Sequence, residues 1–357
     1  MKKSTVKVRR LRTWVTRLGT ALALAASVPM EARAQSARPL PPGVTPETKA
    51  AIDKGLAYLA RTQDRQGSWS NKGGFGEYPV AMTGLAGLAL LMDGNTTTQG
   101  RYAPQVDRAA NYLLRSTSSS GMLVRGDLDS RPMYGHGFGM LFLGELHGMT
   151  DDVTRAEQIQ RVLGAGVQLT ARAQSRLGGW IYTPDSRGDE GSVTITQLQA
   201  LRSARNAGVA VPKAVIDQAM EYLNISQNTD GGIRYTAGSA GPSRPPLAAA
   251  AVCCWYNAGE YKNPRAVNAL NYAKKVLKPD ATIGGHDYYA HLYMSQALYI
   301  GRDPTWAEYY AKRRDVMLTQ QTEDGSWYGD GVGDVYGTAI ALIILQLPFN
   351  VLPIMQQ

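Results

Sequence analysis

A short phrase built around Gly-x-Trp recurs six times along this 357-residue chain at nearly constant spacing. Its third positions lie 54, 57, 53, 53 and 41 residues apart. A period of roughly 50 residues is typical of repeat proteins, in which one unit cannot bury its apolar face and neighbouring units must stack. Three copies keep the tryptophan, at Trp69, Trp180 and Trp327, and the others are Gly121-Met122-Leu123, Gly231-Gly232-Ile233 and Gly284-Gly285-His286. Six stacked units predict a closed ring.

Each unit contains an amphipathic helix that leads into the glycine turn and a second helix that is apolar nearly all round. In the first unit Ala51, Leu56 and Leu59 have the spacing of one helix face. The second helices are rich in Ala, Gly and Leu, as buried helices are, and we expect them over 81–92, 137–146, 193–207, 247–256, 288–300 and 336–347. Five are followed by a glycine at the C′ position, where left-handed backbone commonly ends a helix: Gly94, Gly148, Gly208, Gly259 and Gly301. The pattern predicts an all-α fold, an (α/α)6 toroid of six helix pairs.

The first 34 residues have the features of a secretory signal peptide. A basic head precedes a short apolar run over 18–28, and Ala32-Arg33-Ala34 forms a small-x-small cleavage site. The run is too short for a membrane span of about 20 residues. The Arg9-Arg10 pair leaves both the general secretory and the twin-arginine route open. We therefore expect an exported protein, periplasmic or secreted, with a Pro-rich spacer over 35–46 and a toroid domain over 47–357 that includes a short C-terminal extension.

Charge and cysteine content exclude some classes of function. The signal peptide holds eight of the 38 Lys and Arg residues and one of the 29 acidic residues, so its removal lowers the formal charge from +9 to +2. A nucleic-acid-binding protein needs a concentrated basic face, and the sequence shows none. Cys253 and Cys254 are adjacent on an apolar helix, where a disulfide between them would be strained. The fold must therefore depend on its core.

The repeat resembles that of a known family. The first copy reads Lys54-Gly55-x-x-Tyr58-Leu59-x-x-x-Gln63-x-x-x-Gly67-Ser68-Trp69, and the last reads Gln321-x-x-x-Gly325-Ser326-Trp327 followed by Tyr336-Gly337-Thr338. Both are similar to the QW repeats of squalene and oxidosqualene cyclases. The resemblance implies the terpenoid cyclase/prenyltransferase α/α toroid, with Gln63, Trp69, Trp180, Gln321 and Trp327 in structural roles. Physically, the Gln can bond backbone groups at neighbouring helix ends, and the Trp can pack on the next unit.

The catalytic acid of that family is missing. Class II cyclases protonate an alkene with an Asp-x-Asp-Asp-Thr-Ala phrase, and the nearest phrase here runs from Asp334 to Ala339. Tyr336 and Gly337 stand where the two consecutive carboxylates would be. A phenol with a pKa of about 10 cannot protonate an alkene. A functional cyclase of the family also resembles two such barrels, whereas this chain supplies one.

The zinc ligands of the related prenyltransferases are missing too. Aligned on the end of the fourth inner helix, Ala250 and Val252 take the positions of the Asp and Cys ligands, and Ala290 takes that of the His. His291 comes one residue late, which on a helix turns it by about 100°. We expect no metal and no cofactor.

The remaining candidates lie at the starts of the inner helices, which should meet at one mouth of the barrel. They are Tyr134, His136, Asp189, Glu190, Tyr288, Tyr289, Asp334 and Tyr336. Tyrosines beside carboxylates suit an apolar or sugar-like ligand. The alternative is that the carboxylates cap helices, while the histidines and tyrosines fill the core.

Three classes of function stay open. The first is a toroid that lacks the family's catalytic groups and binds an apolar, isoprenoid or sugar-like ligand, or a protein partner, at the mouth. The second is an enzyme acting on an isoprenoid or lipid substrate through a different site. The third is a glycan-active (α/α)6 hydrolase or lyase, which would need paired carboxylates across the mouth. A fold alone cannot decide between them.

Overall fold

The structure is a computed structural model that describes residues 39–71, 73–185 and 187–356, and every contact below lies within the unit Leu40–Gln357. The predicted signal peptide over 1–34 and the start of the spacer lie outside the described residues. The last residues before the first helix pack on the toroid, since Val44 is buried and Gly43 lies against the Tyr310 ring.

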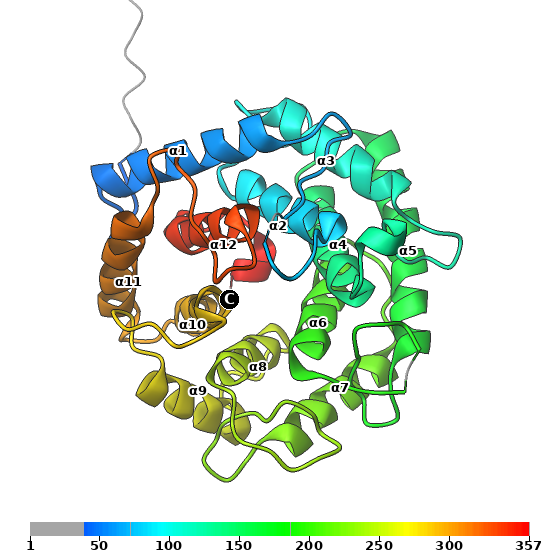
Figure 1. The fold of residues 1–357 in the computed structure, drawn as a ribbon. Helices are drawn as coiled ribbons and strands as arrows, with labels where there is room; N and C mark the ends of the chain where they lie inside the picture. The colour runs from blue at the N-terminus through cyan, green and yellow to red at the C-terminus, as the bar shows by residue number, and fades with distance from the viewer. Residues whose placement is uncertain (1–38, 72, 186, 357) are drawn as a thin grey trace, which may run out of the picture. The chain divides into compact units, whose positions relative to one another are not determined.

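The described residues form twelve α-helices that alternate between an outer and an inner ring (Figure 1). The outer helices are α1 (Pro46–Thr62), α3 (Ala103–Arg115), α5 (Val153–Ala173), α7 (Lys213–Ser226), α9 (Pro264–Val276) and α11 (Trp306–Gln320). The inner helices are α2 (Pro79–Met92), α4 (Pro132–His147), α6 (Gly191–Asn206), α8 (Pro245–Asn257), α10 (Asp287–Ile300) and α12 (Asp334–Gln346). Contacts of α12 with α2 and of α11 with α1 close both rings. The predicted all-α toroid of six helix pairs is confirmed, and the pairs are called units 1 to 6 below.

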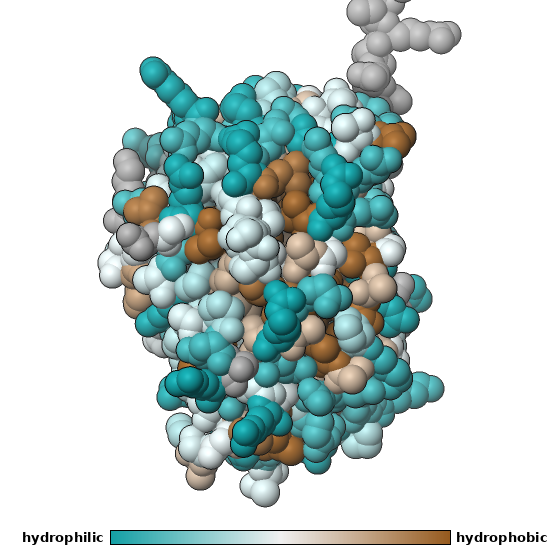
Figure 2. All heavy atoms as spheres, turned by 90° about the vertical axis from the view of Figure 1, so that its right-hand side faces the viewer, coloured by the Kyte–Doolittle hydropathy of each residue, from teal (hydrophilic) through white to brown (hydrophobic). Residues whose placement is uncertain are grey.

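Burial follows the two helix types. Every residue of α2 is buried, and Ala248 to Ala251 of α8 are inaccessible between their neighbours. Outer helices bury one face only, as in α3, where Val106, Ala109 and Leu113 point inward. Figure 2 shows the consequence on the side of α5, a largely hydrophilic surface with scattered apolar side chains. No helix within the described residues is long and apolar enough to cross a membrane.

A Gln–Gly–Trp linkage joins the units. In unit 6, the Gln321 Nε2 group donates to the carbonyl oxygen of Gly325 in its own turn (3.0 Å) and to that of Ala51 in α1 (2.9 Å). The same pair of bonds recurs from Gln63, Gln174 and Gln227. Each glutamine therefore bridges its own glycine turn to the next outer helix.

The tryptophans anchor the same turns. The Trp327 indole is fully buried and donates to the Met317 carbonyl (2.8 Å), and its backbone N–H donates to Thr338 of α12 (3.1 Å). Trp69 and Trp180 repeat both bonds. A Cβ added at Gly55 of α1 would lie 2.9 Å from the Trp327 ring. The indole therefore fills the space between unit 6 and unit 1.

The turn glycines are required for two reasons. Gly325 has φ of +90°, and a Cβ there would lie 2.6 Å from the Lys54 carbonyl oxygen of the next outer helix. Gly67, Gly121, Gly178 and Gly231 share both properties. A side chain would therefore strain the backbone and also push the units apart.

The glycines after the inner helices only partly follow expectation. Gly94, Gly208 and Gly259 have φ between +81° and +85°, as predicted for C′ positions. Gly148 and Gly301 have φ of −70° and −71°, so the left-handed prediction is wrong there. After α10 the left-handed residue is Arg302, with φ of +48°. These two glycines simply continue the helical turn as C-caps.

Residues 347–356 cover the end of the ring where the inner helices finish. The short helix η3 (Pro353–Met355) contacts α6 and α10. The Ile354 N–H donates to the Glu145 carboxylate of α4 (3.2 Å), which also accepts from Ser203 of α6 (2.7 Å). Leu352, Ile354 and Met355 are buried. In Figure 1 the C-terminus accordingly lies inside the ring.

We predict that Trp327→Ala lowers the free energy of unfolding by about 3–5 kcal/mol, because it empties a buried site at the closure of the ring. Denaturant titration measures the change. Tyr328→Ala is the matched control, since this neighbouring side chain is 69% exposed and its removal should leave stability unchanged. Equal stability of Trp327→Ala and the wild type would contradict the structural role.

Candidate functional site

The mouth is the end of the ring where the inner helices begin, and the structure brings four of the eight predicted residues together there. The Tyr134 hydroxyl of α4 lies 2.5 Å from Ser192 and 3.5 Å from the Glu190 carboxylate at the start of α6. Tyr289 of α10 lies close enough to Tyr134, Glu190 and Tyr336 for their charges to raise its pKa, in addition to the larger effect of burial. Three tyrosines and a carboxyl group from four inner helices therefore share one region.

Tyr289 has a hydroxyl group without a hydrogen-bond partner in the described structure, although this oxygen is inaccessible to solvent. Its ring packs edge-on against Tyr293, with centroids 4.7 Å apart. A buried polar atom that lacks a partner is costly in free energy. This hydroxyl interacts with the Tyr293 side chain, where it opposes the larger effect of burial on the pKa of Tyr293, and a ligand would reach it only by displacing the side chains that cover it.

Glu190 caps α6, as the alternative interpretation of the sequence predicts. It is 2% exposed, and its carboxylate accepts hydrogen bonds from the Ser192 and Val193 backbone N–H groups at 3.1 and 2.9 Å. Burial raises its pKa, which these hydrogen bonds partly oppose. This carboxyl group is thus committed to the helix N-terminus.

The other four predicted residues do not line this region. His136 is fully buried, with Nδ1 accepting from the Leu123 N–H (3.2 Å) and Nε2 lying 3.0 Å from Thr170 Oγ1. The His136 ring thus accepts the backbone hydrogen bond that a threonine hydroxyl accepts in the three units that contain tryptophan. Asp189 accepts from the Ala237 N–H (2.8 Å) in the loop before α8.

Tyr288 and Asp334 point towards the outer helices. The Tyr288 hydroxyl lies 3.4 Å from Gln320 of α11. Asp334 is exposed and approaches α1, where its charge adds to burial in raising the pKa of Tyr58 to about 12. Consecutive residues on an inner helix face different layers, so a position near the helix start was not sufficient to predict the side chain's direction.

Three mouth residues that precede the inner helices were not predicted from the sequence. Tyr182 follows the tryptophan of unit 3, and its ring lies 6.0 Å from that of Tyr134. Its hydroxyl bonds that of Tyr235, from the loop before α8. The Arg131 guanidinium lies 4.6 Å above the Tyr182 ring. Their common signal is their place in the loops between the glycine turns and the inner helices.

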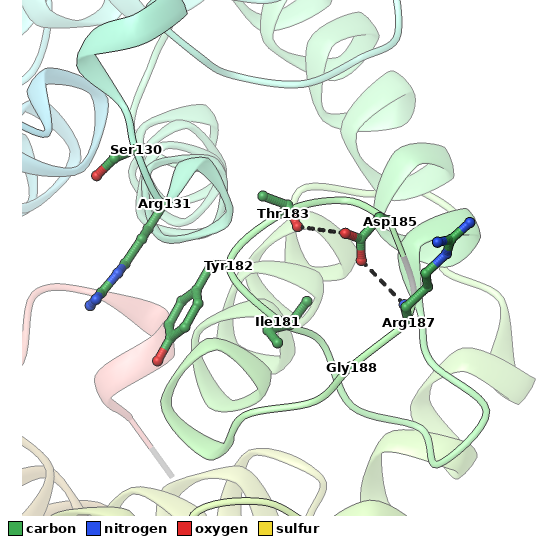
Figure 3. A pocket seen from close by; sticks show the side chains of 8 residues that line it. All are labelled: Ser130, Arg131, Ile181, Tyr182, Thr183, Asp185, Arg187 and Gly188. Carbon is green, nitrogen blue, oxygen red and sulfur yellow. Dashed lines mark hydrogen bonds between the residues drawn. The ribbon is translucent and has the colours of Figure 1, made fainter.

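A cavity of about 410 Å³ opens beside these residues (Figure 3). Its walls are the end of the loop before α4 and the loop before α6, and it is lined by Ser130, Arg131, Ile181, Tyr182, Thr183, Asp185, Arg187 and Gly188. In Figure 3 Arg131 and Tyr182 point to the same side, whereas Arg187 points away from them. The cavity is open to solvent, and Tyr182 is the one tyrosine in its lining.

Below the mouth, hydrogen bonds cross the interior of the ring. Gln199 of α6 donates to Gln296 of α10 (3.3 Å) and accepts from the Tyr293 hydroxyl (3.1 Å). All three side chains are buried. These bonds and the buried C-terminal segment occupy part of the interior of the ring.

A buried polar cluster joins α10 to α11. Asp287 lies 2.7 Å from the Arg313 guanidinium and 3.3 Å from His291 Nε2, while His291 Nδ1 contacts the Tyr309 hydroxyl (2.5 Å). Burial alone would raise the pKa of Asp287, but the hydrogen bond to His291 and the charge of Arg313 lower it to about 2. Burial lowers the pKa of His291, and the hydrogen bond to Asp287 opposes this effect. Unit 5 has neither the Gln nor the Trp, and this cluster takes over the connection.

The positions of the family's acid and zinc ligands are apolar or aromatic. Ala250, Val252 and Ala290 are inaccessible, and Tyr336 is half-buried. The described residues contain no grouping of three or more His, Cys, Asp or Glu side chains that could hold a metal ion. Cys253 and Cys254 are both buried and free.

No protein-family model matches this chain, and no curated protein sequence matches it. Solved structures do match. A GH76 alpha-mannanase from Bacteroides thetaiotaomicron superposes with a TM-score of 0.63 at 9% identity, over 85% of this chain and 95% of that one. An inactive GH76 alpha-1,6-mannanase variant of Salegentibacter sp., in complex with alpha-1,6-mannotriose, gives 0.61 at 8%, over 84% and 98%.

The type II terpene cyclase MstE from Scytonema, in complex with merosterolic acid A, has a TM-score of 0.57 at 14% identity, over 84% of this chain and 96% of its own. At such identities the likeness concerns the fold alone. This cyclase chain is matched almost completely by one toroid. The expectation that a functional cyclase needs two barrels is therefore wrong for that protein.

We predict that the buried Asp287–Arg313 pair makes the free energy of unfolding decrease at acidic pH. The pKa of Asp287 is lowered from 3.8 to about 2, so its contribution is fully present above pH 3.8 and is lost as pH falls through about 2. Asp287→Asn leaves Arg313 buried without its anion and should cost about 3–5 kcal/mol at neutral pH.

Denaturant titrations from pH 6 to 2.5 test this. The difference between the wild type and Asp287→Asn should narrow by about 2 kcal/mol as the pH approaches the lowered pKa. Asp217→Asn is the control, since Asp217 is exposed and pairs only with Lys213 on the surface of α7. A difference that stays constant over this range would contradict the ion-pair assignment.

Proposed function

We propose that this toroid binds a short carbohydrate at its mouth and serves in recognition. It does not carry out the cyclase or prenyltransferase chemistry of proteins with similar QW repeats. The observation that carries the proposal is the group of tyrosines at the mouth, where the Tyr134 ring lies 6.0 Å from that of Tyr182 and the Tyr182 hydroxyl bonds that of Tyr235. The buried Tyr289 hydroxyl is a further donor that ligand binding could expose. Sugars present apolar C–H faces and hydroxyl groups together, and tyrosines can contact the one and bond the other.

The depth of the site favours a sugar over an isoprenoid chain. The cavity at the mouth is open, and the interior below it is crossed by the bonds of Gln199, Gln296 and Tyr293. A prenyl chain needs an apolar chamber that shields it from water. A ring stacked on tyrosines at the surface needs none.

The positions of the carboxyl groups favour recognition of a glycan over its hydrolysis. Glycosidases use a pair of carboxyl groups on either side of the scissile bond. Here Glu190 is held as a helix cap and Asp189 accepts from a loop N–H. Asp334 faces the outer layer. None of these three groups lines the cavity, where the one carboxylate is Asp185.

The comparisons support the ligand class only through the fold. A toroid of this fold has been solved with alpha-1,6-mannotriose bound, and another with merosterolic acid A. The proposed export of this protein would place the site among extracellular glycans. The ligand class itself rests on the chemistry of the mouth.

Calorimetry and ligand-observed NMR with short oligosaccharides test the proposal, using maltotriose, cellotriose and alpha-1,6-mannotriose, with farnesol as the isoprenoid probe. We predict that one saccharide binds and that Tyr289→Phe weakens it by about 3- to 10-fold, the value of one neutral hydrogen bond.

Tyr288→Phe is the matched control, because the neighbouring hydroxyl faces Gln320 of the outer helix and its loss should not change the affinity. Binding of farnesol without any saccharide would favour the isoprenoid class. If Tyr289→Phe and Tyr288→Phe changed the saccharide affinity equally, Tyr289 would not be part of the binding site.

A further inference from the structure

Arg131 is a cation at the mouth without an anionic partner. It immediately precedes α4 and lines the 410 Å³ cavity. Its guanidinium lies over the Tyr182 ring, and among the described residues it makes no hydrogen bond or ion pair. The stacking restricts the orientation of the guanidinium plane. The group is therefore oriented while its N–H donors remain unused.

The neighbouring donors are already occupied. At the start of α4, the Met133 N–H donates to the Tyr182 carbonyl (3.1 Å) and the Tyr134 N–H donates to the Arg131 carbonyl (3.2 Å). The hydroxyls of Tyr182 and Tyr235 bond each other. Arg131 can thus still donate several hydrogen bonds to a ligand, and it differs from Arg187 of the same cavity in being oriented by the Tyr182 ring.

The charges around the cavity leave this cation uncompensated. The lining contains one carboxylate, Asp185, which accepts from the Thr183 hydroxyl (3.0 Å) and the Arg187 N–H (3.2 Å). Glu190 is buried behind Tyr134, where burial raises its pKa. Burial and the bond to Tyr182 raise the pKa of Tyr235, and the charge of Arg131 opposes that rise.

We propose that the ligand is an acidic saccharide whose anionic group, a carboxylate or a sulfate, is bound by Arg131. A planar guanidinium matches such groups with two parallel hydrogen bonds. The rings of Tyr182 and Tyr134 lie 6.0 Å apart, so a sugar ring next to the anion would lie beside Tyr134. This inference rests on the proposed carbohydrate site and specifies that the saccharide bound there is anionic.

Affinities for matched saccharides test the inference. Trigalacturonate, a sulfated galactotriose and neutral galactotriose are titrated into the purified protein at about 50 and 500 mM salt, which changes the screening of charges. At low salt we expect at least one acidic form to bind about tenfold more tightly than the neutral form. The preference should shrink at high salt, and the two acidic probes distinguish carboxylate from sulfate.

Arg131→Gln should abolish this preference, so that the acidic and the neutral forms bind with equal affinity, whereas the control below should keep the preference. Arg187→Gln is the matched control, because this arginine also lines the cavity but points away from Arg131 and Tyr182 (Figure 3). Thermal melting of both variants shows that they remain folded.

The outcomes separate the two proposals. Equal affinity for neutral and acidic forms would overturn the anion assignment and leave the carbohydrate site standing. An equal loss of preference in both arginine variants would remove the assignment to Arg131. Absence of binding by all saccharides, including those used to test the proposed function, would overturn both.

Discussion

The structure depends on one shared amide group, the Nε2 of the repeated glutamine. It holds its own glycine turn and the next outer helix at the same time, as Gln321 does between Gly325 and Ala51 across the closure of the ring. The glycine allows the two backbones to touch, and the tryptophan fixes the turn to the inner helix. Backbone groups at helix ends that would otherwise lack partners are thereby used to join units.

At two places in the ring, other contacts replace part of the Gln–Gly–Trp linkage. In unit 2 the Leu123 N–H bonds His136 instead of a threonine hydroxyl. Between units 5 and 6 the connection passes to the buried Asp287–Arg313 pair. A buried ion pair is costly to form but strongly destabilising to break, so it is specific although it contributes little net stability. The histidine and the aspartate both have structural explanations that do not involve a ligand.

The linkage also determines where a site can form. It lies at the end where the outer helices finish and the inner helices begin, and the C-terminal segment covers the opposite end. Between each fixed glycine turn and its inner helix, a loop is free to vary. Arg131, Tyr182 and Tyr235 lie in such loops, next to tyrosines on the inner helices. A rigid ring with variable loops at one mouth supports many functions on one architecture.

The sequence by itself determined the toroid, the six units and the structural role of Gln63, Trp69, Trp180, Gln321 and Trp327. The toroid and the six units follow from the repeat period and from helical spacing, and the structural roles are those that the resemblance to QW repeats implies. It also gave Tyr134, Tyr289 and Tyr336 as residues of the mouth. It did not separate them from Tyr288, His136, Asp189 and Asp334, which occupy equivalent places near helix starts. Only the tertiary structure decided which side chains face the axis and which face the outer ring, because that depends on the rotation of each inner helix against its neighbours. The tertiary structure also brought Arg131 over Tyr182, because their loops precede neighbouring inner helices, although the two residues are 51 positions apart and no local pattern connects them.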